Sequence, residues 1–307
     1  MSQKNITKDI RNKKIIVIAG PTGVGKTKLS VMLAKKYNGE IINADSMQIY
    51  KDLNIGTAKI TEEEKENIPH YLFDIKNVTE AYSIFDYQKD CRNIIKNIQI
   101  KNKIPIIVGG TGLYIKSALY DYKLNDKIIN NTYDDISTSK LYDKLINLDK
   151  ECIGKIDKNN RRRIINAINY YLENNKSITK NISNNILYDC LFIGLTTDRN
   201  NLYNIINTRV DKMLENGLIN EVKYFYDKNI KTKPLIGGIG YKELYKYFNN
   251  DISLDEAIEL IKKNSRHYAK RQYTFFNHQL PIKWFDTDYN NFNNTFNEVC
   301  KYIDKNI

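Results

Sequence analysis

Residues Gly20 to Thr27, with the sequence Gly-Pro-Thr-Gly-Val-Gly-Lys-Thr, constrain the fold of this chain more than any other feature. They fit the pattern Gly-x-x-x-x-Gly-Lys-Thr, between an apolar segment at 15–19 and a segment with helical spacing at 26–37. Backbone N–H groups in such a loop wrap an anion, and the following helix N-terminus adds partial positive charge. The sequence therefore predicts a strand, a phosphate-binding loop and a helix. The loop residues are Gly20, Pro21, Thr22, Gly23, Val24, Gly25, Lys26 and Thr27.

The end of this loop carries its chemistry. Lys26 offers a full positive charge to phosphate oxygens, and the Thr27 hydroxyl is suited to holding Mg²⁺. Most such loops bind ATP or GTP, and a neighbouring strand then usually ends in a metal-binding Asp. Here the corresponding strand, Ile104–Val108, ends in Gly109 and Gly110, without an acid. That favours small-molecule kinases or other diphosphate chemistry over a motor ATPase.

Short apolar segments alternate with segments of helical spacing along much of the chain. This alternation predicts an α/β fold: a P-loop NTPase-like parallel sheet flanked by helices. We expect further strands at 40–45, 104–108, 191–195 and 282–285. We expect helices at 61–67, after Ser83 as N-cap, after Gly112, and at 200–216, 219–228, 241–248 and 254–277.

The pattern changes between residues 121 and 189, where the chain is polar and rich in Asn. This stretch has a single glycine, Gly154, and no clear strand. We predict a mostly helical insertion domain at 121–189, and a P-loop core formed by 1–120 and 190–307.

The chain of 307 residues has a formal net charge of +12, which suggests a polyanionic partner such as nucleic acid, although a genome-wide bias toward Lys would produce the same excess. The four cysteines form no Cys-x-x-Cys pair, so a zinc site or a disulfide framework is not expected. The first 13 residues have no apolar signal region, and no segment reaches the length of a membrane span. We therefore expect a cytoplasmic protein.

Two further segments follow predicted strands. Asp45 ends the second strand, and in a parallel sheet it should face the phosphate-binding loop. Its carboxylate could bind metal, act as a general base, or cap the next turn. The turn Gly109–Gly112 lies at the same edge, and Thr111 could place a hydroxyl beside a substrate there. Glycine is also common in such turns for backbone reasons alone.

Taken together, these stretches resemble one family, the tRNA dimethylallyltransferases, also called tRNA isopentenyltransferases. The resemblance runs from about residue 14 to about residue 277. The most specific segments are Asn43-Ala-Asp-Ser-Met-Gln48 and Gly109-Gly-Thr-Gly-Leu-Tyr114. Others are Asn54-Ile-Gly-Thr-Ala-Lys59, Arg209-Val-Asp-Lys-Met213, Ile239-Gly-Tyr-Lys-Glu-Leu244 and Tyr268-Ala-Lys-Arg-Gln272.

The resemblance implies a reaction and its residues. The family moves a dimethylallyl group from its diphosphate to N6 of the adenosine on the 3′ side of the tRNA anticodon, so the loop Gly20–Thr27 would hold diphosphate instead of ATP. Asp45 would be the general base. Lys26, Arg209, and Thr27 with Mg²⁺ would stabilise the leaving group, with Asp45 as the second metal-site residue. Thr111 would lie near the target nucleotide.

The resemblance also implies partners: the tRNA anticodon stem-loop and dimethylallyl diphosphate. We expect a monomer. The matched motifs and two clusters of basic residues together predict tRNA contacts at Asp45, Ser46, Met47, Gln48, Thr111, Arg162, Arg163, Gly240, Tyr241, Lys242, Arg266, Lys270 and Arg271.

One segment departs from the family pattern. Lys158 and Asn166 stand where the family usually has Pro and a second Arg, whereas Arg163 matches. Arg161 and Arg162 are candidates to compensate. They belong to a basic cluster at 155–163, and a second cluster comprises Lys262, Lys263, Arg266, Lys270 and Arg271. Both clusters suit contact with phosphate groups, although solvated helix faces carry similar charge.

Three alternative functions remain from the sequence. A P-loop small-molecule kinase would turn over ATP and would not need the basic clusters. An adenylate isopentenyltransferase would prenylate free nucleotides without a tRNA surface. An RNA-binding module with a vestigial loop would not need Lys26, Thr27 and Asp45 together.

Overall fold

The computed structural model describes residues 14–306 except 123, 125–132 and 181. The chain forms two compact units. The core unit takes in the described residues up to Ala118 and those from Tyr188 onward, and the inserted unit spans Leu119–Leu187. The insertion domain was predicted at 121–189.

Among the described residues, six parallel strands form the sheet of the core unit, in the order β3-β2-β4-β1-β7-β8. β1 lies between β4 and β7, and all five of its residues are buried. A strand covered on both faces is expected to be apolar throughout, as Ile-Ile-Val-Ile-Ala is. The strands are β1 (Ile15–Ala19), β2 (Gly39–Asn43), β3 (His70–Tyr71), β4 (Ile104–Val108), β7 (Cys190–Thr196) and β8 (Lys283–Asp286).

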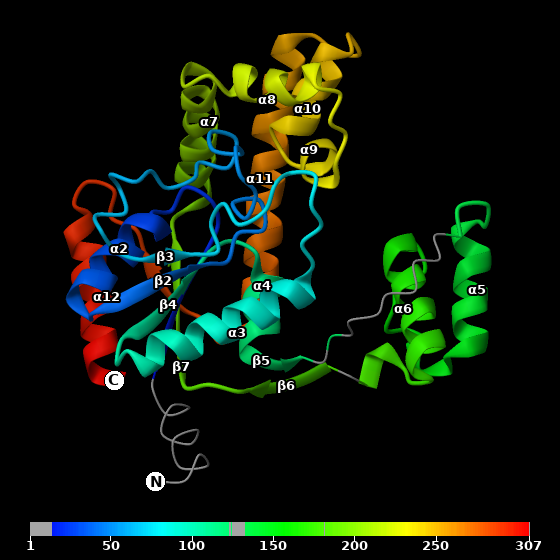
Figure 1. The fold of residues 1–307 in the computed structure, drawn as a ribbon, viewed down its shortest axis with the longest axis horizontal. Helices are drawn as coiled ribbons and strands as arrows, with labels where there is room; N and C mark the ends of the chain where they lie inside the picture. Colours follow the sequence, from blue (N-terminus) through cyan, green and yellow to red (C-terminus); the bar gives the residue numbers. More distant parts are fainter. Residues whose placement is uncertain (1–13, 123, 125–132, 181, 307) are drawn as a thin grey trace. The chain divides into compact units, whose positions relative to one another are not determined.

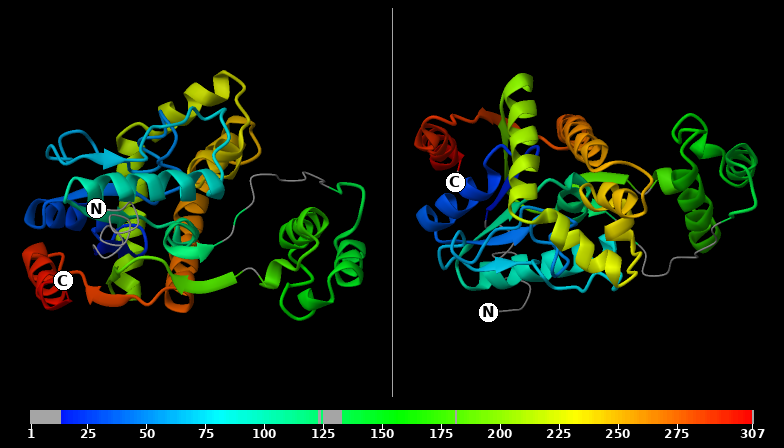
Figure 2. Two further views of the ribbon diagram at one scale, coloured as in Figure 1. Left: turned by 60° about the horizontal axis from the view of Figure 1, so that its bottom comes forward. Right: turned by 90° about the horizontal axis from the view of Figure 1, so that it is seen from above.

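Helices cover both faces of this sheet. α2 (Lys26–Lys36) connects β1 to β2, and α3 (Ile84–Ile100) connects β3 to β4 in the opposite direction across the sheet. Right-handed crossovers therefore place α2 and α3 on opposite faces. α12 (Phe292–Asn306) packs against α2, and Figure 2 shows α12 and α3 on opposite sides of the sheet.

A group of helices in the core unit extends beyond the sheet. Figure 1 shows α7 and α11 side by side, with α8, α9 and α10 near their far ends. α11 is the longest of the described helices and begins with a capping box between Ser253 and Glu256. The bounds are α4 (Gly112–Leu119), α7 (Arg199–Glu215), α8 (Leu218–Asp227), α9 (Lys233–Gly237), α10 (Tyr241–Phe248) and α11 (Leu254–Gln279).

The inserted unit has its own apolar cluster, formed by Leu141, Leu145, Cys152, Ile156, Ile164, Ala167 and Ile168. α5 (Thr138–Leu148) packs on α6 (Arg161–Asn174), which explains the helical spacing of this stretch. The prediction that it lacks a strand was wrong. β5 (Tyr120–Tyr122) and β6 (Ile182–Ile186) form an antiparallel pair, which three- and five-residue segments far apart in the sequence do not reveal.

Some secondary-structure predictions for the core unit were wrong or incomplete, and one helix cap was predicted correctly. Residues 61–67 form turns instead of a helix, with Glu66 and Asn67 at φ of 48° and 61°. This acidic stretch has no apolar stripe to pack, so nothing offsets the cost of starting a helix. The sequence interpretation also did not identify α9, α12 or β3. The predicted N-cap at Ser83 is confirmed, because its side chain and that of Asp86 form a capping box.

Candidate active site

The loops that follow β1, β2 and β4 meet at one edge of the sheet. Backbone hydrogen bonds join them: the Gly109 N–H donates to Ile18 O at 3.2 Å, and the Thr111 N–H donates to Ala44 O at 3.0 Å. Gly109 is required by this close approach, since an added Cβ would lie 2.3 Å from the Ala44 backbone. The phosphate-binding loop, Asp45 and Thr111 therefore lie together, as their positions after parallel strands predicted.

The loop Gly20–Thr27 has the conformation that its glycines permit. Gly20, Gly23 and Gly25 have φ of 141°, 89° and 89°, and Gly25 is the N-cap of α2. The Lys26 ammonium folds back over the loop and donates to Pro21 O at 2.6 Å. The Thr27 side chain, in the first turn of α2, is exposed. This arrangement leaves the start of α2, with its partial positive charge, open to an anion.

Two cations and one acid interact electrostatically beside this loop. Burial and, to a lesser extent, the nearby Arg209 charge lower the pKa of Lys26 to about 7, and Asp45 opposes the shift. Burial also lowers the pKa of Arg209, again opposed by Asp45. Cations that have lost hydration without a full set of partners favour an incoming anion. The site is therefore suited to a polyanion such as diphosphate.

The Asp45 backbone is fixed by Asn43, the last residue of β2. Asn43 Oδ1 accepts from the Asp45 N–H at 2.9 Å, and Asn43 Nδ2 donates to Leu72 O at 2.9 Å and to Asp45 O at 3.1 Å. Asp45 Oδ1 accepts from the Met47 N–H at 2.9 Å, so the carboxylate does cap the next turn. Its second oxygen accepts no hydrogen bond from the described residues, which leaves it available to a substrate proton.

Thr111 lies between Asp45's loop and α11. Its hydroxyl oxygen accepts from the Ser46 N–H at 3.1 Å and lies 3.4 Å from Ser46 Oγ. The Tyr268 hydroxyl interacts with the side chains of Thr111 and Gln272. Burial and the charge of Asp45 raise the pKa of Tyr268 to about 12, so this hydroxyl stays protonated near neutral pH.

Glu221, on α8, has an anchoring role that the sequence did not reveal. Its carboxylate accepts from the backbone N–H groups of Asn54, Ile55 and Gly56, and from the Tyr241 hydroxyl at 2.6 Å. In the loop that Glu221 anchors, the Thr57 carbonyl oxygen accepts a hydrogen bond from Gln48 Nε2 at 3.0 Å and one from Arg209 at 3.4 Å. Glu221 therefore helps to place two residues that the resemblance assigns to the site.

The predicted tRNA contacts fall into different environments. The Tyr241 side chain is fully buried and bonded to Glu221, so it has no surface for tRNA, and that prediction is wrong for the side chain. Gly240 is buried as well, with a φ of 93° at the start of α10. Lys242, Met47 and Gln48 are partly exposed.

The basic residues of α11 also differ in availability. Lys270 and Arg271 are exposed, whereas Arg266 donates to Asn207 Oδ1 at 2.7 Å on α7. Lys262, a member of the predicted cluster, forms an ion pair with Asp211 at 2.8 Å, which neutralises much of its charge. The surface available to phosphate groups is therefore narrower than the sequence suggested.

In the inserted unit, Arg162 and Arg163 are exposed in the first turn of α6, as is Asn166 one turn later. Arg161 is different. Its guanidinium donates to the backbone carbonyls of Ile136 and Tyr133, so it holds the unit together and is not available to compensate for Asn166.

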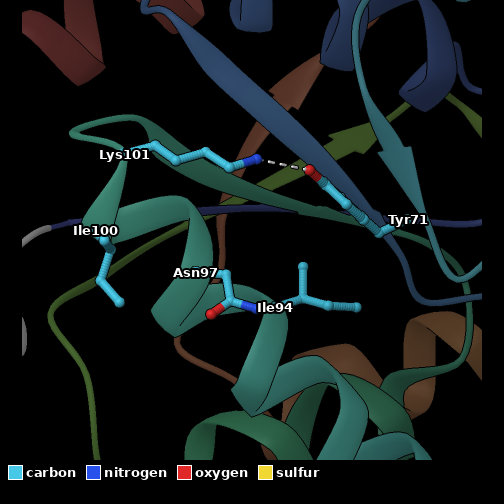
Figure 3. Close-up of a pocket in the computed structure, with 5 residues that line it drawn as sticks. All are labelled: Tyr71, Ile94, Asn97, Ile100 and Lys101. Atoms are coloured by element: carbon cyan, nitrogen blue, oxygen red, sulfur yellow. Dashed lines mark hydrogen bonds between the residues drawn. The ribbon is translucent and has the colours of Figure 1, made fainter.

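A separate pocket of about 380 Å³ is lined by Tyr71, Ile94, Asn97, Ile100 and Lys101 (Figure 3). Lys101 and Lys103 precede β4, so this pocket opens near the end of that strand opposite Thr111. Lys101 donates to the Tyr71 hydroxyl at 3.1 Å, and Tyr71, Lys101 and Lys103 all bond to the buried Glu40 carboxylate. This network satisfies Glu40 and lies apart from the loops after β1, β2 and β4.

A family model described as IPP transferase matches residues 48–279 of the chain. The chain belongs to the IPP transferase family. It is 48% identical over 300 residues to a tRNA dimethylallyltransferase of Anoxybacillus flavithermus, covering 95% of this chain and 96% of the relative. The resemblance inferred from the motifs is thereby confirmed.

Solved structures of IPP transferases share the fold. A tRNA isopentenylpyrophosphate transferase of Bacillus halodurans is 40% identical, with a TM-score of 0.75, covering 96% of this chain and 97% of that one. A eukaryotic dimethylallyltransferase acting on tRNA is 30% identical, with a TM-score of 0.85, covering 96% of this chain and 81% of that one. The predicted α/β, P-loop NTPase-like fold is confirmed.

Two further observations concern the described residues of this IPP transferase. Within them, no group of three or more His, Cys, Asp or Glu side chains is placed to bind a metal ion. Likewise, none of their helices combines the length and apolar character needed to cross a membrane.

Proposed function

We propose that the protein transfers a dimethylallyl group from dimethylallyl diphosphate to N6 of the adenosine on the 3′ side of the tRNA anticodon, releasing diphosphate. One observation carries the proposal: the phosphate-binding loop, Asp45 and Thr111 lie at one edge of the sheet, with Lys26 and Arg209 partly desolvated beside them. A diphosphate would supply the anionic partner that these cations lack, and an acceptor amine would lie on the Asp45 side.

The chain's own residues account for each part of the transfer. The adenine N6 attacks C1 of the dimethylallyl group, the C1–O bond breaks, and the diphosphate leaves with the bonding electrons. Lys26, Arg209 and the N–H groups at the start of α2 stabilise the negative charge that develops on the leaving oxygen. The free oxygen of Asp45 takes the proton from N6. To reach this edge of the sheet, the adenosine must leave its stack in the anticodon loop.

A magnesium ion fits the oxygen ligands at this edge. The exposed Thr27 hydroxyl and the Asp45 carboxylate are hard ligands, and Mg²⁺ usually binds one or two protein oxygens together with substrate phosphates. When bound, it would neutralise charge on the diphosphate. The lack of a larger acidic cluster among the described residues is compatible with such a site.

Each unit carries exposed cations that this proposal assigns to tRNA binding. Arg162 and Arg163 of the inserted unit and Lys270 and Arg271 of α11 are exposed and suited to phosphate groups. Ser46, Met47 and Gln48 lie next to Asp45, where the target base would be held. We propose that the protein acts as a monomer, since the catalytic edge is assembled from one chain. We also propose that it acts in the cytoplasm.

The alternatives fit the site less well. In an ATP-dependent kinase of this class, the strand corresponding to β4 usually ends in a metal-binding Asp, but Gly109 lies at that position here. An adenylate isopentenyltransferase would have no use for the exposed arginines of α6.

One assay separates these functions. The protein is incubated with labelled dimethylallyl diphosphate, Mg²⁺, and either unmodified tRNA or AMP. We expect label in tRNA only. Label in AMP alone would favour the adenylate reaction, and label in neither acceptor would refute prenyl transfer.

A further inference from the structure

Gln272, on α11, connects the two glycine-rich turns of the site. Its Oε1 accepts a hydrogen bond from the Thr22 N–H at 3.3 Å, and its Nε2 donates one to Gly110 O at 3.1 Å. The side chain is buried, with 5% of its surface exposed. A single amide therefore joins the phosphate-binding loop after β1 to the turn after β4.

An amide is the side chain suited to this place, because the bridge needs an acceptor toward Thr22 and a donor toward Gly110. A carboxylate offers only acceptors and would face the Gly110 carbonyl. The contact is also close: a Cβ added to Gly110 would lie 2.1 Å from Gln272 Nε2. Gly110 thus lets the amide reach the backbone.

The same helix face extends the bridge toward the acceptor side. Tyr268 precedes Gln272 by four residues on α11, so the two side chains share a face. The Tyr268 hydroxyl interacts with both the Thr111 and Gln272 side chains. Gln272 is therefore linked to the donor loop on one side and to the acceptor turn on the other.

The contacts of the loop show why this link matters when a ligand binds. Lys26 Nζ donates to Pro21 O, and Gln272 holds the adjacent residue, Thr22. An anion that draws the Lys26 ammonium toward its own oxygens would remove the Pro21 contact. The hydrogen bond from the Thr22 N–H to Gln272 would then be the remaining side-chain contact of the first half of the loop.

We propose that Gln272 is a positioning residue that holds the phosphate-binding loop in register with the Gly109–Thr111 turn, and thereby sets the affinity for the diphosphate of the prenyl donor. This inference rests on the proposed function, in which the donor's diphosphate lies in that loop.

The test compares Gln272→Glu and Gln272→Met in the full chain. Calorimetry gives the Kd for inorganic pyrophosphate with Mg²⁺, and steady-state kinetics gives separate KM values for dimethylallyl diphosphate and tRNA. Gln272→Glu should raise both the pyrophosphate Kd and the donor KM about tenfold or more, because it leaves a buried carbonyl unpaired and adds negative charge. Gln272→Met, which only removes the bridge, should raise them about three- to fivefold. The tRNA KM should change less than about twofold.

Gln279→Glu is the matched control on the same helix. Its Oε1 accepts from Lys116 Nζ at 2.6 Å, and a carboxylate preserves that bond, so pyrophosphate affinity should match that of the wild type. The proposal is overturned if both Gln272 variants bind pyrophosphate like the wild type, or if the tRNA KM rises as much as the donor KM. If Gln272→Glu does not fold, the pyrophosphate Kd and the donor KM of Gln272→Met decide whether the proposal stands. Wild-type protein that binds no pyrophosphate would instead refute the donor site itself.

Discussion

The core unit and the inserted unit use charge in opposite ways. In the core unit, Lys26 and Arg209 are partly desolvated, and anchoring side chains such as Asn43 and Glu221 each make several hydrogen bonds. In the inserted unit, an apolar cluster holds two helices together, and Arg162 and Arg163 extend into solvent. The first arrangement fixes geometry, and the second offers charge.

This difference separates two kinds of energetic effect. A charge interaction in a desolvated site is strong and weakly screened, whereas an exposed cation contributes little by itself and loses that contribution in salt. Changes in the core unit should therefore alter turnover and diphosphate binding. Changes in the inserted unit should alter tRNA affinity and its dependence on salt.

The largest effect is expected for Asp45→Asn. Without the free carboxylate oxygen, the N6 proton loses its acceptor, and kcat should fall by roughly 10² to 10⁴-fold. The tRNA Kd should change less than about threefold, because the Asn side chain can still cap Met47. Asp52→Asn is the control, since Asp52 is exposed in a turn. Unchanged turnover in Asp45→Asn would exclude this residue as the base.

Lys26 should give the site a pH dependence. Its pKa of about 7 in the free protein should rise when an anion binds, so binding takes up a proton. Pyrophosphate affinity attributable to Lys26 should be full below pH 7 and should fall by up to about tenfold per pH unit above it.

Lys26→Arg provides the comparison, because a guanidinium stays charged across this range. Calorimetry from pH 6 to 9 in buffers of different ionisation enthalpy measures the proton uptake. Subtracting the variant's profile removes the ionisation of pyrophosphate itself. Identical profiles for the two proteins would show that Lys26 does not titrate there.

A smaller effect is expected from Glu221→Gln. The amide group would direct N–H toward the backbone N–H groups of residues 54–56, and the Thr57 carbonyl that meets Gln48 and Arg209 would shift. We expect kcat/KM for tRNA to fall about five- to tenfold. Glu215→Gln, at the exposed end of α7, should have no effect. Equal kinetics in both variants would remove Glu221 from the positioning network.

Arg162→Ala and Arg163→Ala test the inserted unit. Each should weaken tRNA binding a few-fold and reduce the slope of log Kd against log salt by roughly 0.7 to 0.9, with kcat unchanged. Arg161→Ala should instead lower thermal stability, because its guanidinium bonds to the Ile136 and Tyr133 carbonyls. A salt slope reduced by Arg161→Ala alone would reverse this assignment.

Asn166→Arg should have the smallest effect. Asn166 is exposed one turn after Arg163, so an arginine there would restore the family pattern and add one cation to this face. We expect tRNA affinity to rise about two- to threefold at low salt, and the gain to vanish at high salt. A filter-binding titration at two salt concentrations measures it. A gain that persists in high salt would indicate a direct contact other than charge.

The sequence by itself determined the elements whose signals are local. β1, the phosphate-binding loop and α2 follow from an apolar run, glycines at positive φ and helical spacing within 22 residues. The capping box at Ser83 and the turn that Asp45 caps are likewise set within three residues. Such features depend only on neighbouring residues, so the local sequence pattern was sufficient to predict them.

Other features depended on packing between distant segments. Thr22 and Gln272 are 250 residues apart, and Gly110 and Gln272 are 162 apart, so no local pattern predicts their bridge. The same holds for Tyr241, which family matching placed at the tRNA and the fold buried against Glu221. A residue's type fixes which bonds it can form, but the order of strands and the packing of α8, α10 and α11 decide which partners it meets.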